Sequence, residues 1–317
     1  MHTPRLCLAE SEQAHLRKYW RSAFDAHWSG ADSLLARISP PNWTLEWSLP
    51  GWLGDAMGLS TDNIREVTIG NLFGLAYVRL HDDLSDERFI DEERAEALAL
   101  ATRLYQRWLA VYIRLFGDSA QFWGHFERYL DQWLLASLES DRLPAAPFEH
   151  YDETHFLALG HRGALIKVCA AATCLLAGRE ELLPRLEHCL DQLMIGAVLL
   201  DHAADWQEDM AAMRPNVFVA SMSPLPQIEA HASANRAAVL RELSIGRGAR
   251  SYFAVIDSRL STAQSTAENA GIAALANDCA WLRHHAASYR RGVAAAARRR
   301  LSEITVELLG ASANLQP

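Results

Sequence analysis

The sequence lacks several patterns that would place the chain in other protein classes. Its five cysteines are an odd number and include no paired CxxC motif, which argues against a disulfide framework and favours reduced thiols. The first residues lead into charged sequence without the apolar core of a secretory signal, and no apolar run reaches membrane-spanning length. These absences predict a cytoplasmic protein with no membrane-spanning segment.

Strongly basic segments are lacking as well. The chain has 30 lysine and arginine residues against 39 aspartate and glutamate residues, which gives a net charge of -9, and the two signs are interspersed. A nucleic-acid-binding surface needs a basic stripe to neutralise phosphates. We therefore expect no nucleic-acid partner.

The alternation of apolar and polar residues that marks half-buried strands is missing too, and helical patterns fill most of the chain. Half of the 317 residues are hydrophobic, which is enough to bury a large core, and the breaks between helical patterns are short. We predict an all-α fold in a single large domain over residues 1–317. The expected helices cover roughly residues 11–28, 61–85, 91–116, 119–141, 152–177, 184–210, 226–244, 249–270 and 272–309.

Two acidic clusters follow apolar stretches of the expected helices. Their aspartates are Asp82, Asp83 and Asp86 in the first cluster and Asp201, Asp205 and Asp209 in the second. Helical residues four apart lie about 40° apart around the axis, so both clusters form stripes that continue apolar faces. Carboxylates placed there are costly unless a cation neutralises them, and Mg²⁺ is held by carboxylates together with phosphate oxygens of a substrate. The clusters predict two halves of one magnesium site, with ordinary solvated helix ends as the alternative.

These motifs resemble those of the class I isoprenoid synthases. The segment 77–87 resembles the first aspartate-rich motif of that family, and the segment 201–209 resembles the second. Between them, the segment 160–167 is similar to the diphosphate-binding helix of trans-prenyltransferases. The resemblance covers about half of the chain. It implies a helical bundle with a central active-site cavity, where three magnesium ions hold the diphosphate of a prenyl substrate.

The resemblance also implies roles for individual residues. The predicted metal ligands are the six aspartates, Asp82, Asp83, Asp86, Asp201, Asp205 and Asp209. For catalysis we expect Asp82 and Asp86, with Arg162 as the cation that senses the diphosphate. Arginine suits bidentate contact with phosphate, and aromatic faces attract a carbocation. The predicted substrate contacts are therefore Arg162, Lys167, Arg214, Arg290, Phe73 and Tyr77.

Departures from the family motifs favour one of its branches. Chain-elongating synthases carry a Gly-Gly-Lys-Arg stretch and an Arg-Arg-Gly motif for isopentenyl diphosphate, and this chain has neither. Its second motif opens with Asp201-His202 where those enzymes have Asp-Asp. These differences favour a single-substrate class I terpene synthase, a lyase that ionises a prenyl diphosphate and cyclises or rearranges the resulting cation.

Alternative functions stay open. Trans-prenyl transfer could proceed by chain elongation or by the head-to-head condensation of squalene and phytoene synthases. A helical metal-dependent phosphohydrolase could use the His81-Asp82 pair with other histidines. The expected partner is a small-molecule prenyl diphosphate, and a second copy of the chain in a homodimer is a candidate assembly.

Overall fold

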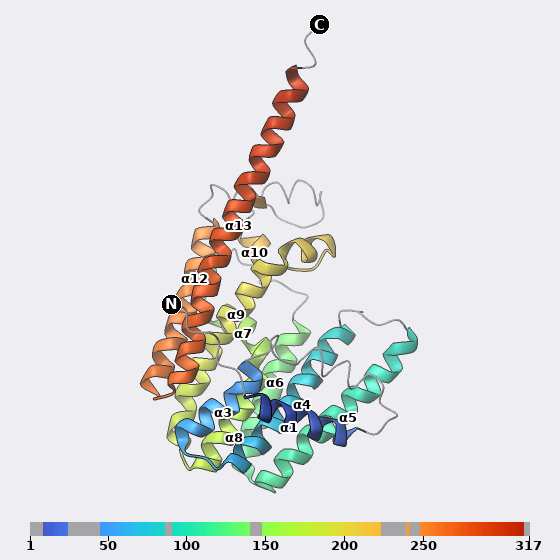
Figure 1. Ribbon diagram of the computed structural model, residues 1–317, viewed down its shortest axis with the longest axis vertical. Helices are drawn as coiled ribbons and strands as arrows, with labels where there is room; N and C mark the ends of the chain where they lie inside the picture. The colour runs from blue at the N-terminus through green and yellow to red at the C-terminus, as the bar shows by residue number, and fades with distance from the viewer. Residues whose placement is uncertain are drawn as a thin grey trace. The chain divides into compact units, whose positions relative to one another are not determined.

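The structure, a computed structural model, describes residues 9–24, 45–85, 91–139, 148–222, 239–240 and 248–313 (Figure 1). Within these ranges every regular element is a helix, and the predicted all-α class is confirmed. The longer helices are α1 (Glu10–Ala23), α3 (Leu45–Met57), α4 (Thr61–Ser85), α5 (Asp91–Phe116), α6 (Ala120–Leu138), α7 (Glu153–Gly160), α8 (Lys167–Ala177), α9 (Leu183–Ala211), α10 (Val217–Met222), α12 (Gly248–Asn269) and α13 (Ala273–Ala313). Three short 3₁₀ helices are η1 (Phe148–His150), η2 (His161–Ile166) and η3 (Glu180–Leu182).

The chain divides into two compact units, and each draws on several separate segments. The first unit comprises Met1–Trp133, Gly163–Leu190 and Gln264–Asp278. The second comprises Leu134–Arg162, Asp191–Ala263 and Cys279–Pro317. The single domain that the sequence predicts over residues 1–317 stays a prediction.

Helix α4 is the central element of the first unit and packs against α3, α5 and α8. Its residues from Val67 to Gly74 are all buried, as expected for a helix that is covered on several sides. Two glycines let α5 approach closely, because a side chain at Gly70 would meet Tyr112 and one at Gly74 would meet Trp108. This close packing brings the aromatic side chains of α5 against the helix that ends in the first acidic cluster.

In the second unit, the part of α9 from Asp191 onward is held by glycine contacts and by tyrosine hydroxyls. A Cβ atom at Gly196 would lie 2.6 Å from the side chain of Leu260 in α12. Further along α9, Tyr252 Oη donates a hydrogen bond to the Leu199 carbonyl at 2.7 Å, and Tyr289 Oη donates to the Ala203 carbonyl at 2.8 Å. These bonds fix α9 where the second acidic cluster begins.

One helical stretch, Glu153–Ala177, is long and apolar enough to cross a membrane, although we expect no such run from the sequence. It comprises α7, η2 and α8, and 72% of its most apolar 18-residue window is buried within the protein. A buried core helix passes the same test of length and composition, so this evidence for a membrane span is weak.

Candidate functional site

The first acidic cluster lies in the last turn of α4. The Asp82 side chain is 47% exposed, and its Oδ2 lies 4.0 Å from Nη1 of Arg79. Asp83 is the buried member of the pair, with 3% of the residue exposed. The sequence predicts that the face of Asp82 points into the protein, whereas the structure turns Asp83 inward and leaves Asp82 half-exposed. Asp86, a predicted metal ligand and catalytic residue, lies outside the described residues.

Aromatic side chains surround the helix turn that precedes this cluster. The ring of Tyr77 lies 5.8 Å from Trp133, 6.3 Å from Trp108 and 5.3 Å from Tyr105, measured between ring centroids. Burial raises the pKa of Tyr77, so its hydroxyl stays neutral at pH 7. His81 lies edge-on against Trp133 with a centroid distance of 5.0 Å. Tyr77 thus lies five residues before Asp82 on α4, about 1.4 helical turns away, and its contact with substrate stays a prediction.

Phe73, the other predicted aromatic contact, lies in a different environment. It is 1% exposed and stacks on Trp20 of α1 with ring centroids 5.5 Å apart. Phe24 lies against the same ring at 6.1 Å. Phe73 therefore serves in the packing of α1 on α4, and its contact with substrate stays a prediction.

The second acidic cluster forms a stripe along α9. Asp201 and Asp205 are exposed, whereas His202, Ala203 and Trp206 on the same turns are buried. Partial burial and the negative charges of the neighbouring aspartates raise the pKa of Asp205 above its ordinary value. A cation bound here would relieve this repulsion, and the divalent metal that the sequence predicts at the stripe stays a prediction.

The third aspartate of the stripe is engaged by the turn after α9. Nε of Arg214 donates to Asp209 Oδ1 at 3.0 Å, and its Nη2 donates to Glu208 Oε1 at 3.0 Å. Nδ2 of Asn216 donates to Asp209 Oδ2 at 2.7 Å. The sequence predicts Arg214 as a substrate contact; here its guanidinium is paired with two carboxylates of α9. Each Asp209 oxygen keeps one lone pair for a further ligand.

Arg162 lies in η2 beside the buried side of the stripe. Its Nη1 is 3.2 Å from Nε2 of His202, and the Val217 backbone N–H donates to Nδ1 of the same ring at 3.0 Å. Burial, with the charge of Arg162 as a smaller cause, lowers the pKa of His202 to about 4, so the ring is neutral at pH 7. The sequence identifies Arg162, but it marks His202 only as a departure from the family motif.

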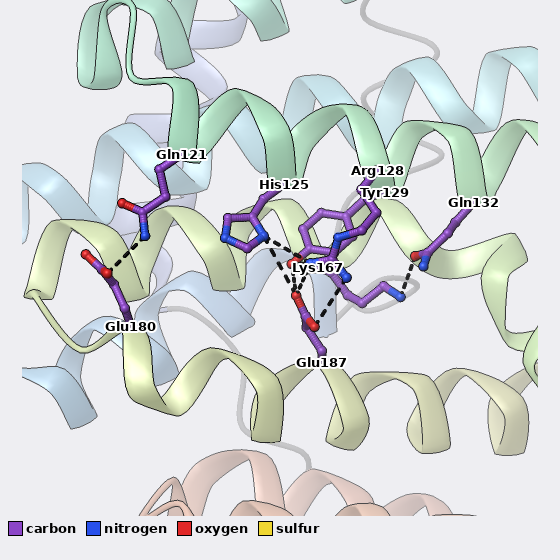
Figure 2. Close-up of polar contacts among 8 residues, drawn as sticks. All are labelled: Gln121, His125, Arg128, Tyr129, Gln132, Lys167, Glu180 and Glu187. Atoms are coloured by element: carbon purple, nitrogen blue, oxygen red, sulfur yellow. Dashed lines mark hydrogen bonds and ion pairs between the residues drawn. The ribbon is translucent and has the colours of Figure 1, made fainter.

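Lys167 belongs to a buried polar network of the first unit, shown in Figure 2. The residue is 2% exposed, its Nζ donates to Gln132 Oε1 at 2.8 Å, and the same atom lies 5.3 Å from the centroid of the Tyr129 ring. Glu187 accepts hydrogen bonds from Tyr129 and from Arg128 in this network. The ammonium group is thus held by protein partners, and its predicted contact with diphosphate stays a prediction.

The remaining residues are Arg290, the last predicted substrate contact, and His125 and His155, two histidines that the phosphohydrolase alternative could use. Arg290 is exposed on α13. His125 contacts Arg128 in the first unit, and His155 completes a capping box with Asp152 at the start of α7. Within the part of the chain that the structure describes, no three metal-binding side chains converge on one point. This arrangement provides no support for a histidine-rich hydrolase centre.

Comparisons with known proteins bear on the fold. The chain superposes on a polyprenyl synthase from Caulobacter crescentus CB15, solved with calcium and isoprenyl diphosphate, with a TM-score of 0.63 and 12% identity over 87% of this chain and 95% of that one. It also superposes on a decaprenyl diphosphate synthase from Rhodobacter capsulatus, with a TM-score of 0.65 and 11% identity over 90% and 97% of the two chains. The chain has the isoprenoid synthase fold. No family model and no curated protein sequence matches it.

Proposed function

We propose that the chain is a metal-dependent enzyme that ionises an allylic prenyl diphosphate. The observation that carries this proposal is the α9 stripe, where partial burial and the charges of two neighbouring aspartates raise the pKa of Asp205. Asp201, Asp205 and Asp209, with Asp82 from the first cluster, are the proposed metal ligands. A bound divalent ion supplies positive charge to the leaving diphosphate.

The fate of the allylic cation distinguishes two candidate reactions. Transfer to isopentenyl diphosphate, as in trans-prenyltransferases, is the first candidate, since the superposed structures carry the names of polyprenyl and decaprenyl diphosphate synthases. Cyclisation is the second, because the chain lacks the basic motifs that bind isopentenyl diphosphate in chain-elongating synthases. The structural likeness therefore favours transfer over the cyclisation that the sequence favours.

The chain's own residues have distinct roles in the proposed reaction. Arg162 provides a permanent positive charge, and arginine suits the recognition of phosphate oxygens. Tyr77 is half-buried on α4 and is the proposed aromatic contact, because an aromatic face stabilises a nearby cation by about 0.5–2 kcal/mol. The carboxylates of α9 bind the metal, and the aromatic rings exclude water from the cation.

The test is incubation with Mg²⁺ and prenyl diphosphates of increasing length, with and without isopentenyl diphosphate, followed by mass spectrometry. Longer diphosphates that require isopentenyl diphosphate would support transfer, and a hydrocarbon or alcohol from one substrate would support cyclisation. EDTA should abolish either product. If no substrate yields a product or releases diphosphate, the proposal is wrong.

A matched pair of aspartate variants tests the metal ligands. Asp201→Asn removes one carboxylate of the stripe, whereas Asp257→Asn removes a carboxylate of α12 whose side chain is 61% exposed and pairs with Arg283. We expect a loss of at least 100-fold in kcat for Asp201→Asn and less than threefold for Asp257→Asn, since one electrostatic contact in a catalytic site contributes about 10²–10³ in rate. Equal effects of the two variants would contradict the assignment.

A further inference from the structure

The buried ring of His202 has a fixed orientation and a fixed acceptor atom. The residue is 7% exposed, and its Nδ1 accepts a hydrogen bond from the Val217 backbone N–H at 3.0 Å. Val217 is 0% exposed and begins α10, so no water replaces this bond. Because Nδ1 uses its lone pair as an acceptor, the proton of the neutral ring is on Nε2.

This tautomer places two donors next to each other. Nε2 of His202 lies 3.2 Å from Nη1 of Arg162, and a guanidinium group has donors only. The two N–H groups cannot bond to one another. A protonated ring would also have a donor at Nε2, but its Nδ1–H would face the Val217 N–H, so the bond from Val217 selects the neutral ring.

In the opposite tautomer two donors also face each other, but at Val217 instead of Arg162. With the proton on Nδ1, Arg162 could donate to Nε2, but the Val217 N–H would face another N–H. A buried donor without a partner is costly, and Val217 is fully buried whereas Arg162 is only half-buried and can reach water. The Nε2–H tautomer is therefore favoured, and both donors are available for a third group that accepts.

We propose that Arg162 and His202 form a binding site in which both donate a hydrogen bond to one anionic oxygen of the substrate diphosphate. The two donor nitrogen atoms lie 3.2 Å apart, close enough for a single oxygen to accept from both. Hydrogen bonds to an ionised acceptor are about twice as strong as bonds between neutral groups. The inference rests on the proposed function, and it adds His202 to the substrate-binding residues.

The residue type at position 202 matters because it sets the charge left on Arg162. An aspartate in this place, as in the motif of the chain-elongating synthases, would accept from Arg162 and form an ion pair with it. The neutral donor ring of His202 does neither. Among the described residues Arg162 forms no ion pair, so its full charge is available to the diphosphate.

Variants at position 202 test the roles of the two ring nitrogen atoms separately. In His202→Asn the amide oxygen can take the place of Nδ1 and accept from Val217, but no group replaces Nε2–H. We expect near-normal thermal stability and an affinity for inorganic pyrophosphate with Mg²⁺, measured by calorimetry, that is about ten- to 100-fold weaker. His202→Asp should lose affinity as well, because it neutralises Arg162. In the double variant with Arg162→Gln the losses should not add, because both donors serve one oxygen.

The tautomer gives a second measurement that needs no variant. The ¹⁵N chemical shifts of the His202 ring should show the Nε2–H form in the wild-type protein, and the Nε2 proton should shift downfield when magnesium pyrophosphate is added. An Nδ1–H tautomer, or unchanged affinity in an active, folded His202→Asn enzyme, would overturn the assignment of His202 alone. Wild-type protein that neither binds magnesium pyrophosphate nor releases diphosphate from a prenyl substrate would overturn the proposed function itself.

Discussion

The close approach of α5 to α4 at Gly74 allows a prediction of protein stability from interatomic distances. A Cβ atom at Gly74 would lie 2.7 Å from Cε2 of Trp108, and ordinary contacts begin at 3.4 Å, so the ring must move by 0.7 Å, the difference of these two values. Trp108 is 1% exposed and packs on Phe126 with ring centroids 4.8 Å apart. The ring has little room to move, and overpacking of this kind costs about 1–3 kcal/mol.

The substitution Gly74→Ala also changes the helix propensity of the residue. A control variant with the same change in propensity isolates the cost of overpacking. Alanine is favoured over glycine inside a helix by about 1 kcal/mol, so the net loss for Gly74→Ala should be about 0–2 kcal/mol. Gly124 lies in the interior of α6, where an added Cβ atom would meet nothing within 4 Å, so Gly124→Ala should gain about 1 kcal/mol. The expected difference between the variants is about 1–3 kcal/mol, which is the overpacking cost alone.

Urea denaturation followed by far-ultraviolet circular dichroism measures this difference. The two alanine variants should have similar m-values and clearly separated midpoints, with Gly74→Ala lower. If Gly74→Ala were stabilised as much as Gly124→Ala, the close approach of α5 to α4 at Trp108 would be refuted.

Two further predictions concern charged groups. Asp205→Asn should raise the melting temperature in EDTA, because partial burial and the charges of the neighbouring aspartates disfavour the ionised carboxylate and raise its pKa. The same variant should reduce the stabilisation by magnesium pyrophosphate, and an unchanged response to both conditions would contradict the metal assignment. Burial raises the pKa of Glu187, but hydrogen bonds from Arg128 and Tyr129 outweigh it and hold the pKa below its ordinary value of 4.5. This carboxylate therefore contributes stability above pH 4.5 that is lost as the pH falls through its lower folded pKa. The difference in melting temperature between wild type and Glu187→Gln should narrow below pH 4.5. A difference that does not change with pH would refute the network of Glu187, Arg128 and Tyr129.

The central helices could be predicted from the sequence because local and tertiary preferences agree in them. The predicted ranges 61–85 and 91–116 coincide with α4 and α5. Helix α3 is missed, since Pro50, Gly51 and Gly54 within it argue against a helix; burial of its apolar side chains overrides these local preferences. The predicted helix over 226–244 falls outside the described residues except for 239–240.

The helices that carry the acidic residues could be predicted, but the contacts of the cationic residues could not. The expected helix over 152–177 is interrupted by η2, and a 3₁₀ segment of six residues turns the following residues by about 120° and adds about 3 Å of rise relative to an α-helix. Spacing along an ideal helix therefore does not give the direction of Lys167, whose Nζ donates to Gln132. The donor role of His202 depends on Val217, fifteen residues away, and no local pattern indicates such a contact.

The hydroxyl groups of Tyr252 and Tyr289 have a consequence for how the α9 stripe meets its ligands. Each donates to a carbonyl of α9, at Leu199 and Ala203, and a rotation of the helix by one residue would break both bonds. The stripe is thus preorganised before any ligand arrives. If the proposed metal and diphosphate bind there, the backbone of α9 loses little entropy on binding, and more of the interaction energy would be retained as affinity.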